Sequence, residues 1–431
     1  MKLIISLPKI KIPKITLPRI TSWRIWAAML SIFMAAGATC GVMVLWKGLS
    51  LTNLTDLVPW GLWITIDLSS IAVSAGAFSL CAVVYLLRMK RFQPVARTAT
   101  FIGLIGYSMA TMTLMLDIGR PDRFWHSLVY WNEHSLLWEV TMCVTLYLGV
   151  LLLETLPIFA NIDWLRDCWP RLAGRMSQAH QLAPYLAIAG LALSMLHQSS
   201  LGALYGVLIA RPLWYRPDIS VLFIISAVAS GMSLTVFASM LSAWLTRRAS
   251  VDDHLLDRIS QIIGWILVLY LYFRFWDAWS MNYTYQPGRT EGLHLLTDGP
   301  LSFNFWVGEI LVGIIIPMIL LLNKRTRALP LWRMLALLFV VGGVVAYRWD
   351  TNISGLMVVL SYLPGDPNIS YASYHPSLIE FLVGGGIISY GLLAFSLGVR
   401  YLKVVNHYST VVHVLQPESK TMEQLPVPAG D

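Results

Sequence analysis

Long runs of apolar residues, separated by short polar segments, dominate the pattern along the chain. A helix needs about 20 consecutive apolar residues to cross the hydrocarbon core of a bilayer, and ten runs are long enough. The predicted spans are residues 24–46, 61–87, 98–118, 135–157, 183–209, 219–246, 259–281, 302–323, 331–352 and 377–402. These runs are too long and too uniformly apolar for the alternating strands of a membrane barrel. They predict an all-α integral membrane protein.

Lys and Arg are distributed unevenly between the two sides of this arrangement. With the spans threaded in order, 23 of these residues fall on the side of the N-terminus, six fall on the opposite side and two lie within spans. Because cytoplasmic loops carry the excess of Lys and Arg, both termini are predicted to be cytoplasmic. The net charge of +8 follows from this topology and does not indicate binding to nucleic acid.

Two segments outside the membrane flank the predicted transmembrane domain, residues 24–402. Residues 1–23 repeat proline every five positions among basic and β-branched residues, which forbids a continuous helix. They predict an extended basic arm on the anionic cytoplasmic membrane surface. Residues 403–431 form a cytoplasmic tail. The longest outward loops, 282–301 and 361–376, are rich in Gly, Pro, Asn and Tyr and suit the docking of a partner protein.

A weak internal repeat runs through the spans. The segment SLLWE ends at Glu139 and enters the fourth span, and NFWVGE ends at Glu309 and enters the eighth. Asp117 near the outer end of the third span has its counterpart in Asp277 of the seventh. The members of each pair cross the membrane in the same direction, which predicts a parallel repeat of two four-helix bundles plus two peripheral helices. Chance similarity between apolar segments is the alternative explanation.

Most acidic residues inside the spans, together with a few basic ones, fall near the outer end. They are Asp67, Asp117, Glu139, Asp277, Glu309, Asp350 and Glu380, with Arg274, Arg348 and His197. A charge in hydrocarbon costs several kcal/mol, so such residues line a cavity, pair with each other, or handle protons and ligands. A purely structural network of ion pairs is the alternative. The excess of acids over bases favours carboxyl groups that exchange protons.

His197 and Glu139 are the first candidates for this chemistry. His197 is the one histidine of nine that lies well inside a span, and small residues such as Ser200 leave room beside it for a flat ligand. Imidazole titrates near neutrality and can hydrogen-bond a carbonyl oxygen, as a quinone head group requires. Nothing local neutralises Glu139. Either residue could instead be satisfied by a neighbouring helix.

The second and third spans add further candidates at the same depth. Trp60 and Trp63 mark the outer interface, where aromatic belts lie, and Asp67 is about two turns deeper. Asp67 is a candidate proton carrier or a helix–helix hydrogen-bond partner. Asp117 is another candidate, although Arg120 and Arg123 could enclose it in a structural ion-paired corner.

The remaining candidates concern charge pairing and cofactors. Arg274 and Asp277 are three residues apart and can pair on one helix face. The four cysteines are dispersed without a C-x-x-C spacing, so an iron–sulfur cluster is not expected in this chain. One intramembrane histidine cannot provide bis-histidine haem ligation. No metal site is therefore predicted.

Taken together, these segments resemble the NrfD/polysulfide reductase membrane-subunit family, and within it the ten-helix type of PsrC- and HybB-like subunits. The resemblance covers residues 24–402. It rests on PWGLWITID, GYSMATMTLMLDIGRPDRFWH, NEHSLLWEVTMCVTLYLG, LHQSSLGALYG, FRFWD and the segment of Glu309. It implies a haem-free site for a quinone or quinol such as menaquinone, near the periplasmic face of a bacterial or archaeal cytoplasmic membrane.

The resemblance also implies partners and roles. Electrons would pass to or from a periplasmic ferredoxin-like iron–sulfur subunit, in a complex whose catalytic subunit is a molybdopterin enzyme, a [NiFe] hydrogenase or a multihaem cytochrome. His197 would bind the head group, with Ser200, Trp60 and Trp63 as neighbours. Glu139, Asp67 and Asp117 would exchange protons, and Arg274 with Asp277 would support the site. The direction of electron flow and the quinone type stay open.

Two other functions are compatible with the same residues. A secondary transporter or ion-translocating protein would use the buried acidic cluster, although transporters usually place their site near the midplane between broken helices. A passive membrane anchor with a vestigial site is the third possibility.

Overall fold

The computed structural model describes residues 22–85, 89, 92–246, 251–283, 285–363, 366–402 and 404–405. The predicted basic arm, apart from residues 22–23, and the predicted tail, apart from residues 404–405, lie outside the described residues. Within them, ten helices are long and apolar enough to cross a membrane. The prediction of an all-α membrane protein is confirmed.

The ten long helices agree with the predicted spans to within a few residues at most ends. They are α1 (Ser22–Lys47), α2 (Leu62–Tyr85), α3 (Gln93–Asp117), α5 (Leu136–Phe159), α8 (Ala183–Gly206), α9 (Asp218–Thr246), α10 (Asp253–Tyr283), the π-helical segment η5 (Asn304–Ile315) continued by α12 (Ile316–Leu322), α14 (Pro330–Met357) and α15 (Leu378–Tyr401). Helices α3, α10 and α14 extend five or six residues beyond the apolar runs, since a helix need not end where the hydrocarbon ends.

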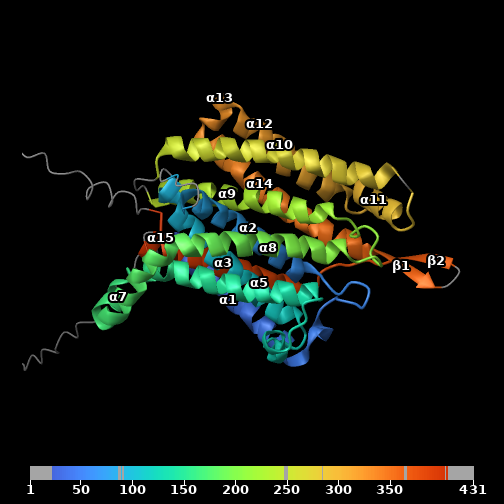
Figure 1. Ribbon diagram of the computed structural model, residues 1–431, viewed down its shortest axis with the longest axis horizontal. Coiled ribbons are helices and arrows are strands. Elements are labelled where there is room, and N and C mark those ends of the chain that lie inside the picture. The colour runs from blue at the N-terminus through green and yellow to red at the C-terminus, as the bar shows by residue number, and fades with distance from the viewer. Residues whose placement is uncertain are drawn as a thin grey trace, which may run out of the picture.

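Short elements connect the long helices. They are η1 (Leu49–Leu51), η3 (Pro121–Arg123), α4 (His126–Val129), α6 (Asp163–Cys168), α7 (Pro170–Gln178), η4 (Ala179–Leu182), α11 (Arg289–Thr297) and α13 (Lys324–Arg327). Figure 1 shows α11 at one end of the long helices, and α7 and α13 at the other. We call the α11 end the outer end, following the charge-based prediction.

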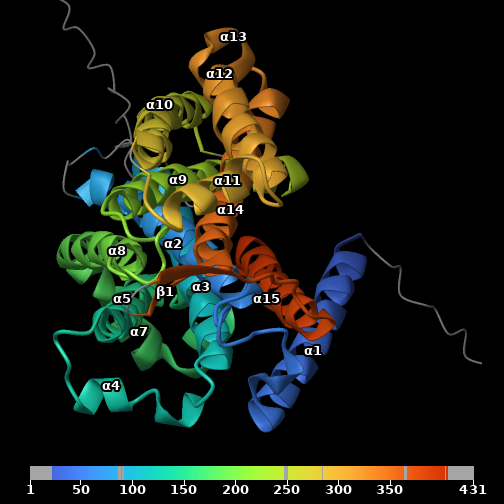
Figure 2. The same cartoon turned by 90° about the vertical axis from the view of Figure 1, so that its right-hand side faces the viewer.

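The long helices form two four-helix bundles, as the internal repeat predicted. In bundle one, α2, α3, α5 and α8 each pack against the next and α8 closes the ring on α2. In bundle two, α9, α10, η5–α12 and α14 are arranged in the same way. Helix α1 packs on α15, and this peripheral pair lies beside α3 (Figure 2).

Glycines bring the two bundles into backbone contact. A side-chain carbon added to Gly76 of α2 would collide with the carbonyl of Ala227 on α9, and one added to Gly231 of α9 would collide with Gly76 and Ala77. Close helix crossings in membranes depend on such small residues because apolar burial alone does not drive helices together in lipid. Helices α2 and α9 therefore cross in direct backbone contact, with no space for a lipid chain between them at this point.

The outward segment 361–376, predicted as a loop, contains part of a β-hairpin. Strand β1 (Val358–Leu363) pairs antiparallel with β2 (Asp366–Tyr371), in a register from Val358 opposite Tyr371 to Leu363 opposite Asp366. The hairpin projects from the outer end (Figure 1). A search for long apolar runs does not detect such short strands, although Val358 and Val359 favour extended backbone.

Candidate functional site

Two wholly buried side chains meet in the interior of bundle one. The hydroxyl of Tyr107 on α3 hydrogen-bonds Nδ1 of His197 on α8. Nε2 of His197 has no hydrogen-bond partner among the described residues. When Tyr107 donates to Nδ1, the imidazole proton resides on Nε2. The pair then holds the ring in one orientation and presents a buried N–H donor to a ligand.

The carboxyl group of Glu139 lies one helical turn further toward the outer end. Ser200, three residues after His197 on α8, donates a 2.6 Å hydrogen bond to Oε1 of Glu139. Glu139 belongs to the first turn of α5, which Ser135 caps, and it is partly exposed. It therefore lies between the level of the buried histidine and the outer surface.

Two more carboxyl groups, those of Asp67 and Asp117, interact with each other at the outer end of bundle one. Asp67 on α2 is 2% exposed, and its Oδ1 has no hydrogen-bond partner in the described part of the chain. Asp67 interacts electrostatically with Asp117, the last residue of α3, and Asp117 interacts with Glu380 of α15. The ion-paired corner considered for Asp117 does not form, because Arg120 pairs with Asp122 instead, at 3.1 Å.

The two tryptophans of the second span have different surroundings. The ring of Trp60 stacks on Trp214 and meets Tyr205 of α8 edge-on, each at 5.7 Å between centroids. Trp63 is buried against α1 and α15, and its Nε1 donates a 3.1 Å hydrogen bond to the backbone oxygen of Glu380. Trp60 thus covers the outer end of bundle one. Trp63 instead lies among residues of α1 and α15, apart from Tyr107, Glu139, His197 and Ser200, which we call the His197 cluster.

Glu380 anchors the entrance of α2 through its own hydrogen bonds. It accepts hydrogen bonds from the hydroxyl of Tyr374 and from the backbone N–H groups of Asn53 and Ser377, at 3.1 and 2.8 Å for the last two. Burial raises the pKa of Tyr374, and the hydrogen bond to Glu380 raises it further. Tyr374 therefore stays a neutral donor, and Glu380 serves as a structural acceptor.

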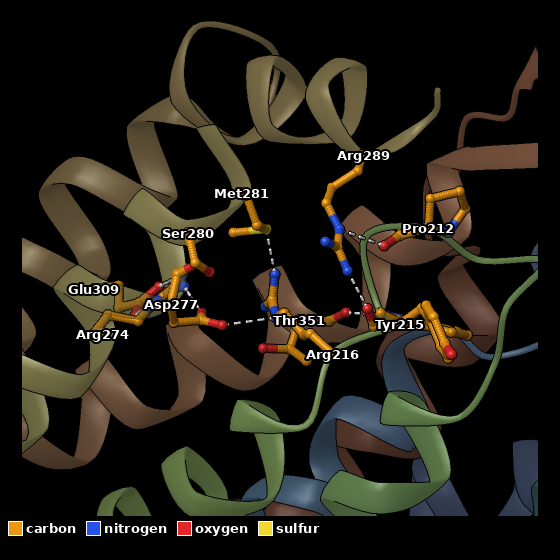
Figure 3. A network of polar contacts seen from close by, with 11 residues as sticks. Pro212, Tyr215, Arg216, Arg274, Asp277, Ser280, Met281, Arg289, Glu309 and Thr351 are labelled. Carbon is orange, nitrogen blue, oxygen red and sulfur yellow. Dashed lines mark hydrogen bonds and ion pairs between the residues drawn. The ribbon is translucent and has the colours of Figure 1, made fainter. Parts of the chain in front are cut away.

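Two arginines and two carboxylates at the outer end of bundle two neutralise one another (Figure 3). Arg274 donates to both oxygens of Glu309, at 2.7 and 3.2 Å, and to Asp277 at 2.6 Å. Arg216 pairs with the other oxygen of Asp277 at 2.8 Å. The predicted pairing of Arg274 with Asp277 is confirmed. No hydrogen bond or ion pair among the described residues links Arg274 or Asp277 to His197.

Sequence reasoning missed a second polar layer in bundle one. Tyr147 on α5 packs edge-on against Tyr107, at 4.5 Å between ring centroids. Nearer the other end of α5, Glu154 has a buried oxygen without a partner in the described chain and interacts electrostatically with Tyr147 and Cys81. The spacing of Glu139, Tyr147 and Glu154 in the sequence could have predicted this layer, because it places the three side chains on one face of α5.

A lipid-facing groove lies on the other side of α3. It has a volume of about 570 Å³ and runs between α3, α5 and α15, past Phe101, Leu152 and the hydrogen-bonded pair of Ser108 and Tyr390. None of the residues of the His197 cluster lines it. Within the described residues, no group of three or more His, Cys, Asp and Glu side chains is placed to hold a metal ion.

Comparison with known proteins gives a consistent set of matches. The family model described as "Polysulphide reductase, NrfD" matches residues 50–360. The menaquinone reductase integral membrane subunit of Nitratidesulfovibrio vulgaris is 32% identical over 392 residues, covering 88% of this chain and 91% of that protein. A selenate reductase subunit of Mesobacillus selenatarsenatis is 26% identical over 425 residues, or 90% of this chain and 96% of that protein.

A third relative comes from a hydrogenase. The probable Ni/Fe-hydrogenase 2 b-type cytochrome subunit of Escherichia coli is 25% identical over 371 residues, covering 83% of this chain and 86% of that protein. The three relatives are thus subunits of oxidoreductase complexes whose catalytic reactions differ. Each of them aligns with 83% or more of this chain.

Proposed function

The chain belongs to the polysulphide reductase NrfD family, and on that premise we propose that it exchanges electrons and protons between a membrane quinone and a partner subunit of a respiratory complex. It performs this half-reaction only within the complex. Relatives from a menaquinone reductase and a selenate reductase support a quinone-interacting role. The name of the Nitratidesulfovibrio vulgaris relative favours menaquinone as the substrate.

The contact of Tyr107 with His197 is the observation that carries this proposal. When Tyr107 donates to Nδ1, Nε2–H of His197 donates to a carbonyl oxygen of the quinone. In the other tautomer, Nδ1–H donates to the Tyr107 oxygen and Nε2 accepts a proton from the quinol, so Tyr107 holds the ring in place in both directions. The flat surface of Trp60 and the hydroxyl of Ser200 border the same region. Trp63 fits the site less well, since it faces α1 and α15.

The carboxyl groups around His197 provide the protons. Reduction of a quinone consumes two electrons and two protons, and oxidation of the quinol releases them. Glu139, partly exposed, exchanges protons with the outer side, and the buried Asp67 and Asp117 extend the set. Tyr147 and Glu154 offer a further route toward the opposite end of bundle one. Arg274 and Asp277 support the site from bundle two as a structural pair.

The partner that carries electrons docks at the outer end, on the periplasmic side of the cytoplasmic membrane. We infer a ferredoxin-like iron–sulfur subunit, with a catalytic subunit beyond it. Exposed aromatic side chains after α3 support a protein contact here, since Trp125, Tyr130 and Trp131 are 45%, 68% and 70% exposed. The β1–β2 hairpin and α11 project from the same end. A two-stranded hairpin alone is marginally stable in water, so a docked subunit would add to the support that β1 receives from the hydrogen bond of the Leu360 N–H to the oxygen of Ala210.

A secondary transporter finds less support. Its main argument was the acidic cluster, and two of those acids, Asp277 and Glu309, are ion-paired with Arg216 and Arg274. A passive anchor would bind no quinone.

The test is a purified, membrane-reconstituted complex assayed in two ways: with a naphthoquinone substrate, and with a redox dye that reacts with the partner subunits. His197→Ala should remove most quinone-linked turnover and leave dye-linked turnover and assembly intact. His180→Ala, on the exposed η4 turn, is the matched control. Normal quinone turnover in His197→Ala complexes would contradict the proposal.

A further inference from the structure

Arg348, near the outer end of α14, is a buried guanidinium without an acidic partner. Its side chain is 0% exposed. In the described part of the chain no carboxylate lies within ion-pair distance of it, and its Nε and Nη1 make no hydrogen bond there. An unpaired charge is among the costliest groups to bury in a membrane protein, so its presence indicates a function.

One hydrogen bond of Arg348 reaches bundle one, and two stay within bundle two. Its Nη2 donates to Oε1 of Gln198 on α8 at 3.3 Å, and to the backbone oxygen of Phe223 and the hydroxyl of Ser226 on α9, at 3.1 Å each. The guanidinium carbon lies 3.5 Å from the centroid of the Phe223 ring. Gln198 is the neighbour of His197 in the chain. Arg348 thus brings a positive charge from α14 to the helix that carries the candidate quinone ligand.

Among the described residues, no carboxylate of bundle two forms an ion pair with Arg348. The two other buried arginines of this region are already paired with two carboxylates, in the set Arg216, Arg274, Asp277 and Glu309. Asp350 accepts a 2.7 Å hydrogen bond from Asn304 of η5 and makes no ion pair with Arg348. Toward bundle one, Tyr205 on α8 interacts electrostatically with both Arg348 and Asp67. The positive charge of Arg348 thus lies within hydrogen-bond distance of Gln198, the residue that follows His197 on α8.

We propose that Arg348 supplies the positive potential that stabilises negative charge on the quinone head group during turnover. This inference rests on the proposed function. An electron that arrives from the partner's iron–sulfur cluster makes the head group negative before a proton follows from His197 or a carboxyl group. In the opposite direction, the quinol becomes negative when it loses a proton and before its electron leaves for that cluster. Arg348 acts on both states through its charge, without contact with the substrate.

Two variants that change the charge in different ways test this role. Arg348→Gln removes the charge, and Gln198→Glu leaves Arg348 in place but sets a carboxylate against it. Since the substrate itself is neutral, each variant should lower kcat roughly 10- to 100-fold, as expected for a unit charge acting over several ångströms at an effective dielectric constant of about 20. KM should change by less than about threefold, because neutral binding is preserved. Arg348→Lys keeps the charge and should retain most of the turnover.

The assay uses the whole reconstituted complex, a short-chain naphthoquinone in its oxidised and reduced forms, and dye-linked activity as the measure of intact partners. If Arg348 served only to hold the two bundles together, Gln198→Glu would add an ion pair between them and would not lower kcat. Wild-type kcat in assembled Gln198→Glu complexes would overturn the inference even if Arg348→Gln fails to assemble. If Gln198→Glu complexes keep the wild-type kcat while His197→Ala complexes lose quinone turnover, only the inference about Arg348 is refuted. If His197→Ala complexes also turn over quinone normally, the proposed function is refuted as well.

Discussion

Ser200 on α8 donates a 2.6 Å hydrogen bond to Glu139 on α5, across 61 positions of the sequence. This contact fixes a carboxyl group one helical turn from His197. It joins two residues that the sequence had singled out separately, one for its charge and one for its small size. The first prediction concerns this pair.

Glu139→Gln should reduce quinone-linked turnover by about 10²- to 10⁴-fold, the usual effect of losing a proton-transfer group. Ser200→Ala should cause a smaller loss, since the carboxyl group stays but is no longer held in place. Turnover per assembled complex is the measurement, and Glu133→Gln, in the exposed segment before α5, is the control. Wild-type turnover in Glu139→Gln complexes would exclude Glu139 from the proton route.

Tyr107→Phe keeps the aromatic ring and removes the hydroxyl that binds Nδ1 of His197. A buried nitrogen left without its partner costs about 1–3 kcal/mol of stability. The imidazole also loses the contact that sets its orientation, so we expect roughly tenfold slower quinone turnover. Thermal unfolding and kcat of the complex report the two effects. Tyr185→Phe, at an exposed position of α8, should change neither.

Arg274→Gln should act on assembly rather than on catalysis. The change leaves Glu309 buried without its cation, and breaking a buried ion pair costs about 3–5 kcal/mol. We expect less assembled complex and a lower unfolding temperature, with turnover per complex close to that of the wild type. Arg274→Gln combined with Glu309→Gln should recover part of the loss. A large change in KM for quinone would instead place Arg274 in the binding site.

The purified chain, freed of its partners, should show no Soret absorbance. The Escherichia coli relative is named a b-type cytochrome subunit, but bis-histidine ligation needs two histidines inside the membrane, and here His197 alone lies well inside a span. Absorbance spectra and iron analysis measure this directly. Stoichiometric haem would contradict the ligand argument.

Fusion reporters should place segments 161–182 and 247–258 in the cytoplasm and segment 282–301 outside, because Lys and Arg are concentrated on the side of the first two. A cytoplasmic signal from 282–301 would invert the sidedness assumed for the quinone site and for the docking surface. Reporters in 161–182 and 282–301 are the pair that discriminates best, because residues 253–258 of the remaining segment already belong to α10.

The sequence alone determined the number and position of the membrane helices. Length and apolar composition are properties of a continuous segment, and the bilayer thickness sets the length that is needed. The pairing of Arg274 with Asp277 was predictable for a similar reason, since three residues of one helix bring the two side chains to the same face. The two bundles followed from repeated segments that cross the membrane in the same direction.

The tertiary structure decided which side chains meet. Helices such as α2 and α8 differ little in hydrophobicity between their faces, so their sequences do not say which side chain turns toward which neighbour. The contact of Trp63 with α1 and α15 could not be predicted for that reason. Tyr107 and His197 lie 90 positions apart, and Arg348 and Gln198 lie 150 apart. Such contacts depend on the rotation of each helix about its axis. That rotation is fixed by the packing of all neighbouring helices at once, including close crossings such as that of Gly76 with Gly231.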